Sequence, residues 1–388
     1  MPELPEVEAA RHLVDHLLVG SVVTKVISIE TGGGPREGQY DDLIIQHTEE
    51  EFAAALLHRP LLAAKRKGKQ LWLEMGKASS KDTKKKSSGS SELGSVDCCV
   101  LIHLGMTGSL VVQGHPAPGY KSFKVQDEEW PPRFCKFELC FANGERLAFC
   151  DPRRIGRVRI IKSAEAEKEE PLSKLAPDPF LDQIDVKGFT NSISKIKTNI
   201  KSVLLDQERL LSGVGNWIAD EVLYQAKIHP SSICSALDEK QVQTLAATIM
   251  SVVKIAVKCT TSKTEFPSDW LFHYRWGKAG EKHTSKDAHG KSIVFETVGG
   301  RTSAIVPSVQ KLQKAPSKKP IVAVVAVKEE SKYFKAKAEI DGKRDDGKKV
   351  KAKAAQMAPK KRKIKVEEMV EEEEEMSTKV KRQRKDRN

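Results

Sequence analysis

The stretch MPELPEVEAARHLVDHLLVG, residues 1–20, determines how the fold begins. Pro5 suits the first turn of a helix, and Glu6 and Glu8 complement the positive end of the helix dipole. Apolar residues recur on one face as far as the glycine at position 20: Val7, Ala10, Val14, Leu17 and Leu18. The stretch therefore predicts an amphipathic helix, preceded by an unusual proline and carboxylate.

Downstream of this helix the pattern is mainly that of β-strands. The strand-like runs are SVVTKVISI (21–29), KQLWLEM (69–75), DCCVLIHLGMTGSLVV (97–112) and KFELCFANGERLAFC (136–150), the last with Asn143-Gly144 as a hairpin turn. We expect residues 1–165 to form one domain of the α+β class. Its Gly/Ser/Lys-rich segment 77–95 cannot bury a core and is predicted to be a disordered insert.

The second half of the chain changes character. Residues 166–182 are rich in charge and proline and predict a linker. Residues 183–265 have helical periodicity, and residues 266–310 have the pattern of a β-hairpin. Lysine, alanine and glutamate dominate residues 311–388, which predicts a disordered tail with basic and acidic runs.

Composition limits the kinds of partner. The formal net charge of +13 over 388 residues favours a polyanion, with nucleic acid the first candidate and an anionic membrane surface the second. We expect no apolar run long enough to span a bilayer, and an acidic helical start is unlike a secretory signal, so we expect a soluble intracellular protein. Seven cysteines without a C-x-x-C pair indicate reduced thiols rather than disulfides or a cysteine zinc site.

The first residues suggest a chemistry. Removal of Met1 would leave Pro2 with a free secondary amine, and α-amino groups titrate near neutrality. Such an amine can attack a sugar carbon and form an iminium, and Glu3 is placed to move protons. The alternative is that Met-Pro is only a common start and that the glutamates only stabilise the helix.

Five motifs occur in order: PELPEVE (2–8), KGKQLWLEM (67–75), HLGMTGSL (103–110), DPRRIG (151–156) and SGVGNWIADEVL (212–223). With these motifs the sequence resembles the formamidopyrimidine-DNA glycosylase family over roughly residues 2–310. The resemblance implies an N-terminal helix with an antiparallel β-sandwich, a helical domain with a helix-two-turn-helix, and a β-hairpin finger.

The resemblance also implies catalytic roles. Pro2 is expected to be the nucleophile, Glu3 the general acid/base, and Glu6 a second active-site carboxylate. Lys69 matches the family's hairpin lysine, which approaches the damaged nucleotide and its phosphate. Without the resemblance, Lys69 would be interpreted as one surface lysine of the run KRKGK.

A glycosylase must turn a base out of the duplex and fill the gap that it leaves. In the family a Met, an Arg and a Phe do this; here Met106 and Arg153 match the first two, and Ile155 stands at the third position. An aliphatic wedge can still separate stacked bases. Arg154 belongs to the same motif and is also expected to contact DNA. The alternative for Met106 is a core methionine.

Phosphate contacts are expected from the second half of the chain. In SGVGNWIADE, Asn216 is expected to cap a helix whose free amides hold a phosphate, and it matches the family's phosphate ligand. Lys197, in KIKTNIK, is the expected second ligand, and Arg301, in the turn GGRTS, matches the finger arginine. A sharp helical hairpin without a ligand is the alternative for this motif.

The finger departs from the bacterial pattern of four zinc-binding cysteines. Val306 and Val309 stand at the last two cysteine positions, and His283, Asp287 and His289 have no further ligands after them. The sequence therefore resembles the family's zincless finger, with neither metal nor cofactor expected.

These features together predict a bifunctional DNA glycosylase/AP lyase of base excision repair, a monomer that acts on damaged double-stranded DNA through a Pro2 Schiff base and β,δ-elimination. The segment FPSDWLFHYRW (266–276) lacks the family's longer lid loop, so formamidopyrimidines and abasic sites are expected to be better substrates than 8-oxoguanine. The basic clusters at 359–366 and 379–385 predict recognition by nuclear import machinery and a nuclear location. The alternatives are an endonuclease VIII-like glycosylase for oxidised pyrimidines and a noncatalytic binder of damaged DNA or chromatin.

Overall fold

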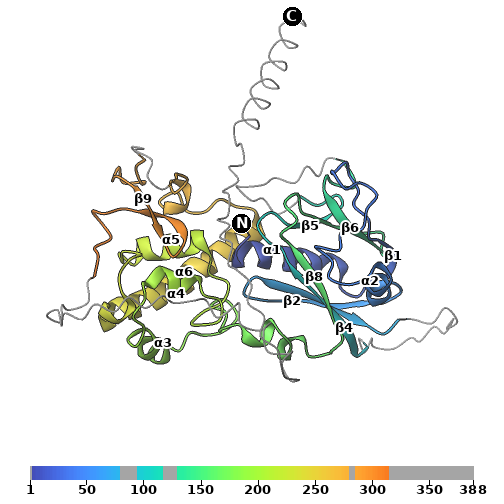
Figure 1. The fold of residues 1–388 in the computed structure, drawn as a ribbon, viewed down its shortest axis with the longest axis horizontal. Coiled ribbons are helices and arrows are strands. Elements are labelled where there is room, and N and C mark those ends of the chain that lie inside the picture. Colours follow the sequence, from blue (N-terminus) through green and yellow to red (C-terminus); the bar gives the residue numbers. More distant parts are fainter. Residues whose placement is uncertain (1, 79–93, 117–128, 279–284, 314–388) are drawn as a thin grey trace, which may run out of the picture. The chain divides into compact units, whose positions relative to one another are not determined.

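The structure is a computed structural model that describes residues 2–78, 94–116, 129–278 and 285–313. These residues belong to one compact unit, Met1–Pro320. Most of the predicted insert at 77–95 and nearly all of the predicted tail at 311–388 lie outside the described residues. Figure 1 shows the labelled strands of the first half of the chain gathered around helix α1 (Leu4–Leu18), and helices α3 to α6 together with strand β9 on the other side of the unit.

Two four-stranded antiparallel sheets form the first half of the unit. One has the order β1 (Val23–Ile27), β6 (Cys135–Phe141), β7 (Arg146–Cys150), β5 (Ser109–Val112). The other has the order β2 (Leu61–Lys67), β3 (Gln70–Gly76), β4 (Val96–His103), β8 (Arg157–Ile161). Apolar side chains of both sheets share one core, for example Phe137 with Leu71, so the predicted β-sandwich is confirmed. The hairpin turn at Asn143-Gly144 is also confirmed, with Gly144 at φ +90°.

Helix α1 belongs to both halves of the unit. Val7, Ala10, Val14 and Leu18 are buried in the sandwich core, as their spacing predicted. Leu4 is buried instead among the helices of the second half. The first turn of α1 therefore lies where the two halves meet.

One helix was not predicted. Helix α2 (Glu49–Leu56) begins with a reciprocal capping box between Thr48 and Glu51, and it buries Phe52 and Leu56. At eight residues it is too short for its periodicity to stand out from the surrounding strands.

The second half contains α3 (Val186–Ile193), α4 (Ile200–Leu205), α5 (Asn216–Gln225), α6 (Glu239–Ser262) and the hairpin β9 (Val294–Val298) and β10 (Arg301–Ile305). By length and composition alone α6 is long and apolar enough to cross a membrane. The expectation that the chain has no apolar run long enough to span a bilayer was therefore wrong. Its apolar face, including Leu245, Ile249 and Val253, is buried in the helical core, which accounts for its hydropathy.

The segment predicted as a linker packs against the second sheet. It contains two 3₁₀ turns, η1 (Ala166–Lys168) and η2 (Leu172–Lys174). Ala166 and Leu172 cover Trp72 on the outer face of β3, while the neighbouring Leu71 and Leu73 face the sandwich core. Residues 166–182 are therefore part of the packed structure.

Candidate active site and nucleic-acid interface

The carboxylate of Glu3 lies at the start of α5. It is buried and accepts hydrogen bonds from the backbone amides of Trp217 at 2.9 Å and Ile218 at 3.1 Å, which α5 itself leaves unpaired. Burial raises the pKa of Glu3, although Lys69 and the two amides oppose the rise. Gly215 makes this approach possible, because a Cβ there would lie 2.2 Å from the Glu3 Cδ.

Glu6 lies one helical turn further along α1. Its Oε2 accepts from the backbone amide of Glu3 at 2.9 Å, and its Oε1 accepts from the indole of Trp217 at 3.1 Å. Burial, with a further contribution from the charge of Glu3, raises the pKa of Glu6 to about 7. Glu6 can therefore exchange a proton near neutral pH. Pro2 is also buried, and it immediately precedes Glu3 in the chain.

Lys69 reaches the same place from the turn between β2 and β3. Its Nζ donates to the Val214 carbonyl at 2.9 Å. Burial lowers the pKa of Lys69, Glu3 opposes the shift, and the charge of Arg301 adds to it. The predicted residues Glu3, Lys69 and Arg301 are thus near one another in space although they come from three distant parts of the chain.

A buried ion network holds the turn that carries Lys69. Arg66 pairs with Asp178 and donates to Glu8 Oε2 at 2.7 Å and to the Gly68 carbonyl at 2.9 Å. Asp178 in turn accepts from the Gly68 amide at 2.7 Å. The network joins α1, the turn and the segment 166–182. Sequence reasoning missed it, although an arginine in an alternating strand pattern was a usable signal.

Asn216 connects α5 with the hairpin. The N-cap of α5 is Gly215 and Asn216 is its first helical residue, so the predicted capping role was wrong: the carboxylate of Glu3 takes the amides that a capping side chain would bind. Asn216 Nδ2 donates to the Thr302 carbonyl in β10 at 3.0 Å. Arg301, at the start of the same strand, is exposed.

A second network lies behind Asn216, and sequence reasoning missed it as well. The ammonium of Lys201, in α4, pairs with Asp220 and donates to Ser303 Oγ at 2.6 Å, and Arg275 donates to Asp220 Oδ2 at 2.7 Å. Burial lowers the pKa of Lys201, and the charges of Asp220 and Glu3 oppose the shift. The predicted Lys197 lies instead on the exposed turn between α3 and α4.

The two loops predicted to enter the duplex are tied together by one carboxylate. Asp151 is buried and accepts from Thr107 Oγ1 at 2.7 Å, from the Arg153 amide at 3.2 Å and from the Ile155 amide at 2.8 Å. Met106 is half-buried in the turn next to Thr107, Ile155 is half-buried, and Arg153 is exposed. The structure therefore brings these three predicted residues onto adjoining loops.

Arg154 is engaged within the protein. Its backbone is left-handed at φ +53°, and its guanidinium makes two hydrogen bonds to the buried Asp41, at 2.7 and 2.9 Å. Burial would raise the pKa of Asp41, but the hydrogen bonds and charge of Arg154 lower it below its usual value. Arg154 thus anchors the loop of Arg153 and Ile155, and its predicted DNA contact stays a prediction.

The hairpin is organised around apolar side chains. Ile293, Phe295, Val306 and Tyr224 belong to one buried cluster, with Val309 partly buried against it. Both carboxylate oxygens of Asp287 accept hydrogen bonds, one from the Tyr224 hydroxyl. In the described part of the chain no group of three His, Cys, Asp or Glu could hold a metal, so the residues present do not fit zinc; His283 lies outside that part.

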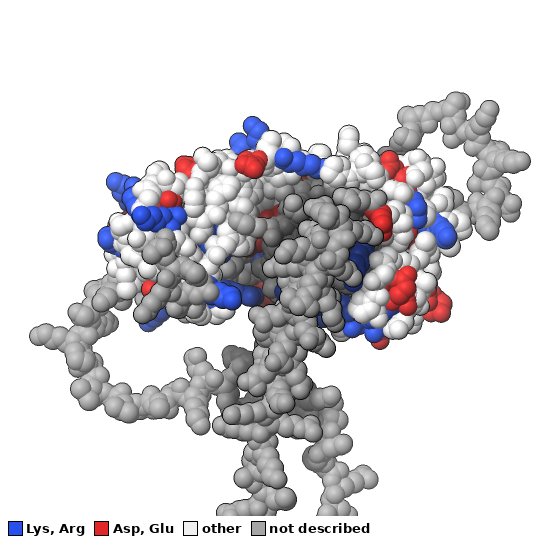
Figure 2. Space-filling model, turned by 90° about the horizontal axis from the view of Figure 1, so that it is seen from above, with Lys and Arg blue, Asp and Glu red and all other residues white. Residues whose placement is uncertain are grey.

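Basic side chains are spread over the surface. Figure 2 shows lysine and arginine on both halves of one face, with aspartate and glutamate among them. The net charge of +13 suits a polyanionic partner.

Comparison with known proteins identifies the class. Residues 1–158 match the model of the formamidopyrimidine-DNA glycosylase N-terminal domain, and residues 175–268 match that of its helix-two-turn-helix domain. A formamidopyrimidine-DNA glycosylase of Arabidopsis thaliana is 36% identical over 349 residues, covering 89% of this chain and 78% of the relative. One from Herpetosiphon aurantiacus is 29% identical and covers 75% of this chain and 89% of the relative.

Solved structures have the same fold. The Lactococcus lactis Fpg (MutM) in complex with FAPY-dG-containing DNA is 25% identical with a TM-score of 0.58, and the match covers 80% of this chain and 100% of that one. MutM in complex with DNA containing carbocyclic 8-oxo-G has a TM-score of 0.59 at 24% identity and the same coverage. Fold and site define a DNA glycosylase of base excision repair with AP lyase activity. The chain belongs to the formamidopyrimidine-DNA glycosylase family.

Proposed function

We propose that the protein removes oxidised purines, with formamidopyrimidines foremost, through a Schiff base on Pro2, and then cleaves the strand by β,δ-elimination. The observation that carries this proposal is that Glu3, the residue after Pro2 in the chain, lies close enough to Glu6 and Lys69 to influence the pKa of each, with the pKa of Glu6 near neutrality and that of Lys69 lowered by burial. Titratable groups that differ in this way can divide acid and base roles between them.

The proposed steps are as follows. Once Met1 is removed, the neutral amine of Pro2 forms a bond to C1′ as the glycosidic bond breaks, and the base leaves with a proton. The deoxyribose ring then opens: the bond between C1′ and the ring oxygen breaks, a carboxyl group protonates that oxygen, and the iminium forms at C1′. Loss of a C2′ proton then expels the 3′ phosphate, and a second elimination expels the 5′ phosphate. Glu3 and Glu6 are the groups placed to carry these protons.

The substrate preference follows from the segment between α6 and the hairpin. After α6 the chain makes one 3₁₀ turn, η4 (Leu271–His273), and then enters the hairpin region. Because the segment 266–276 lacks the longer lid loop that the resemblance implies, formamidopyrimidines and abasic sites are preferred over 8-oxoguanine. The protein acts as a monomer on duplex DNA, and the basic clusters at 359–366 and 379–385 direct it to the nucleus.

Covalent trapping tests the mechanism. The methionine-processed protein and a Pro2→Gly variant are incubated with duplex DNA containing an abasic site and sodium borohydride, which reduces a Schiff base to a stable amine. A covalent protein–DNA band that is lost or greatly weakened in the variant is the expected result. Binding without a trapped band in the wild type would instead support the noncatalytic binder, and a panel of lesions separates purine from pyrimidine specificity.

A further inference from the structure

One residue donates hydrogen bonds to both candidate catalytic carboxyl groups. The backbone amide of Trp217 donates to Glu3 Oε1 at 2.9 Å, and its indole Nε1 donates to Glu6 Oε1 at 3.1 Å. Because Trp217 is buried, bulk water does not compete for these bonds. The first turn of α5 therefore contacts both carboxyl groups, one through the backbone and one through a side chain.

The ring of Trp217 is held by the segment between α6 and the hairpin. It stacks on Phe266 with the ring centroids 5.3 Å apart, and Phe272 packs edge-on against it at 5.1 Å. Phe266 in turn stacks on Trp270 at 5.3 Å and packs edge-on against Phe272 at 4.6 Å. Aromatic pairs in these arrangements stabilise one another beyond the burial of their surface. The direction in which the indole N–H points thus depends on this segment.

A buried carboxyl group joins the same segment to α5. Glu221 lies one helical turn after Trp217, and its Oε2 accepts from the backbone amide of Phe272 at 2.8 Å. Its Oε1 accepts from Gln225 Nε2 at 2.8 Å. The aromatic side chains around Trp217 are therefore fixed to the helix whose first turn contacts the carboxyl groups.

We propose that Trp217 is a positioning residue for the proposed reaction, in which its indole fixes the carboxyl group of Glu6 and the segment 266–276 fixes the indole. This inference rests on the proposed function, because it concerns a proton that Glu6 carries there. A donor to an ionised carboxylate favours the charged form. Loss of the indole N–H should therefore raise the pKa of Glu6 above its value of about 7.

Other charges also act on Glu6. Glu3, on the same helix, raises the pKa of Glu6, and the amino terminus lowers it. Lys69, on the turn between β2 and β3, acts on Glu6 as a cation. The remaining charged side chains on the elements packed against α1 are engaged elsewhere or exposed: Arg66 pairs with Glu8 and Asp178, Lys65 pairs with Glu74, Lys67 donates to the Leu172 carbonyl, and those of α6 are exposed.

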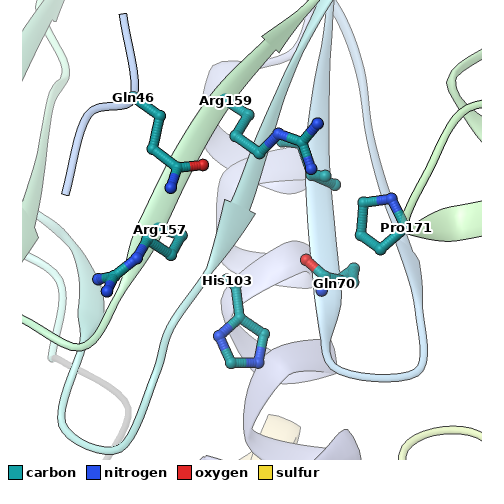
Figure 3. Close-up of a pocket in the computed structure, with 7 residues that line it drawn as sticks. Gln46, Gln70, His103, Arg157, Arg159 and Pro171 are labelled. Atoms are coloured by element: carbon teal, nitrogen blue, oxygen red, sulfur yellow. The ribbon is translucent and has the colours of Figure 1, made fainter. Parts of the chain in front are cut away.

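Groups other than Glu6 that titrate near pH 7 require controls. Burial raises the pKa of Glu221 to about 7, and the amine of Pro2 is also expected to titrate near neutrality. His103 does not interfere. It lines the pocket on the outer side of the second sheet (Figure 3), where burial, and then the charges of Lys69 and Arg157, lower its pKa to about 4.

Nuclear magnetic resonance of isotope-labelled indole groups tests the contact without DNA. The chain has five tryptophans, and the resonance of Trp217 is identified by its loss in Trp217→Phe. We expect this resonance to titrate with a midpoint near pH 7 in the wild type, to stop titrating in Glu6→Gln and to keep titrating in Glu221→Gln. A Trp217 resonance that does not titrate, or that titrates unchanged in Glu6→Gln, would overturn the proposal.

The pH profile of single-turnover cleavage at an abasic site tests the consequence for the reaction. Trp217→Phe keeps an aromatic ring but loses the N–H, and it should move the ionisation of Glu6 upwards by about one pH unit, as expected for a lost hydrogen bond to a charged group. Trp270→Phe makes the same change elsewhere in the aromatic cluster and should leave the profile in place. Equal shifts in the two variants, or no shift in Trp217→Phe, would overturn the proposal.

The role of the segment 266–276 has its own variant. Phe266→Leu removes the ring that stacks on Trp217 and keeps an apolar side chain, so it should shift the profile in the same direction as Trp217→Phe but by less. An unchanged profile in Phe266→Leu would overturn the role of the segment.

Failure of this inference and failure of the proposed function give different results. The indole titration is measured on the free protein, so it decides whether Trp217 contacts Glu6 whatever the chemistry at Pro2. A wild type that binds abasic DNA without a borohydride-trapped band would refute the proposed function and leave the indole result standing.

Discussion

At the scale of single residues, Gly215 is the position on which the carboxylate of Glu3 depends. We expect Gly215→Ala to displace that carboxylate from the amides of Trp217 and Ile218, since a methyl group would lie within 2.5 Å of both its oxygens. Abasic-site cleavage should fall at least about tenfold, which corresponds to only ~1.4 kcal/mol in the barrier. Single-turnover cleavage assays measure this effect.

The matched control for that substitution is Gly94→Ala. Gly94 has an ordinary φ and nothing within 4 Å of an added Cβ, so cleavage should be unchanged. Full activity of Gly215→Ala would show that Glu3 does not need its place at the start of α5. The sequence suggested that Glu3 moves protons, but it gave no sign of the glycine that admits it, because the two are more than 200 positions apart.

Glu6 should make stability depend on pH. Its folded pKa is about 7 against 4.5 as the ordinary value, so between these values the folded protein binds more protons than the unfolded chain. This contribution to stability is fully present below pH 4.5 and is lost as pH rises through 7, a difference of roughly 3 kcal/mol. Glu6→Gln, which resembles the protonated carboxyl group, should remove that loss.

Urea unfolding at pH 4.5 and pH 8 provides the measurement for Glu6. The wild type should lose more stability than Glu6→Gln between the two pH values, and the exposed Glu208→Gln should follow the wild type. Equal losses in wild type and Glu6→Gln would mean that Glu6 ionises as an ordinary surface carboxylate.

At the scale of elements, the turn between β2 and β3 depends on the segment 166–182. Asp178→Asn should lower the free energy of unfolding by about 3 kcal/mol, because it leaves Arg66 buried with a weakened partner. Lys69 should be displaced with the turn, so trapping should weaken as well. Denaturant titration and trapping together measure both effects.

Glu165→Gln is the control for Asp178→Asn, in the same segment. It breaks an exposed pair with Lys168, and such pairs contribute less than about 1 kcal/mol. If Asp178→Asn behaved like this control, the segment would be the loose linker that its prolines and charges predicted. Its composition was misleading because the residues that secure it, Ala166, Leu172 and Asp178, are few and aperiodic.

The hairpin of β9 and β10 should be insensitive to metal removal. Chelation with EDTA is expected to leave its unfolding midpoint unchanged, whereas Phe295→Ala should cost about 3 kcal/mol because it empties the cluster with Ile293 and Val306. Thermal unfolding with and without chelator measures both. A shift with EDTA would indicate metal ligands that the described residues do not contain.

At the scale of the whole molecule, local sequence patterns predicted secondary-structure elements and candidate residues, whereas contacts between distant parts of the chain could not be predicted. Periodicity predicted α1, α6 and most strands, and the five motifs predicted candidate residues for the site. They could not predict which groups would meet: Lys201 rather than Lys197 is buried near Glu3, and Arg154 is bound to Asp41. Such pairings depend on how the two halves dock, and no local pattern encodes that.

The docking itself leads to a final prediction. Because α1 buries Leu4 in the helical core and Val7 in the sandwich core, neither half can keep its core intact if the other unfolds. We therefore expect one cooperative transition, in which amides of β3 and of α6 lose protection from hydrogen exchange at the same denaturant concentration. Leu4→Ala should lower that shared midpoint, at a cost of about 2–5 kcal/mol. Two separate transitions in the wild type would mean that the halves are independent domains, and the active site between them would then form only on docking.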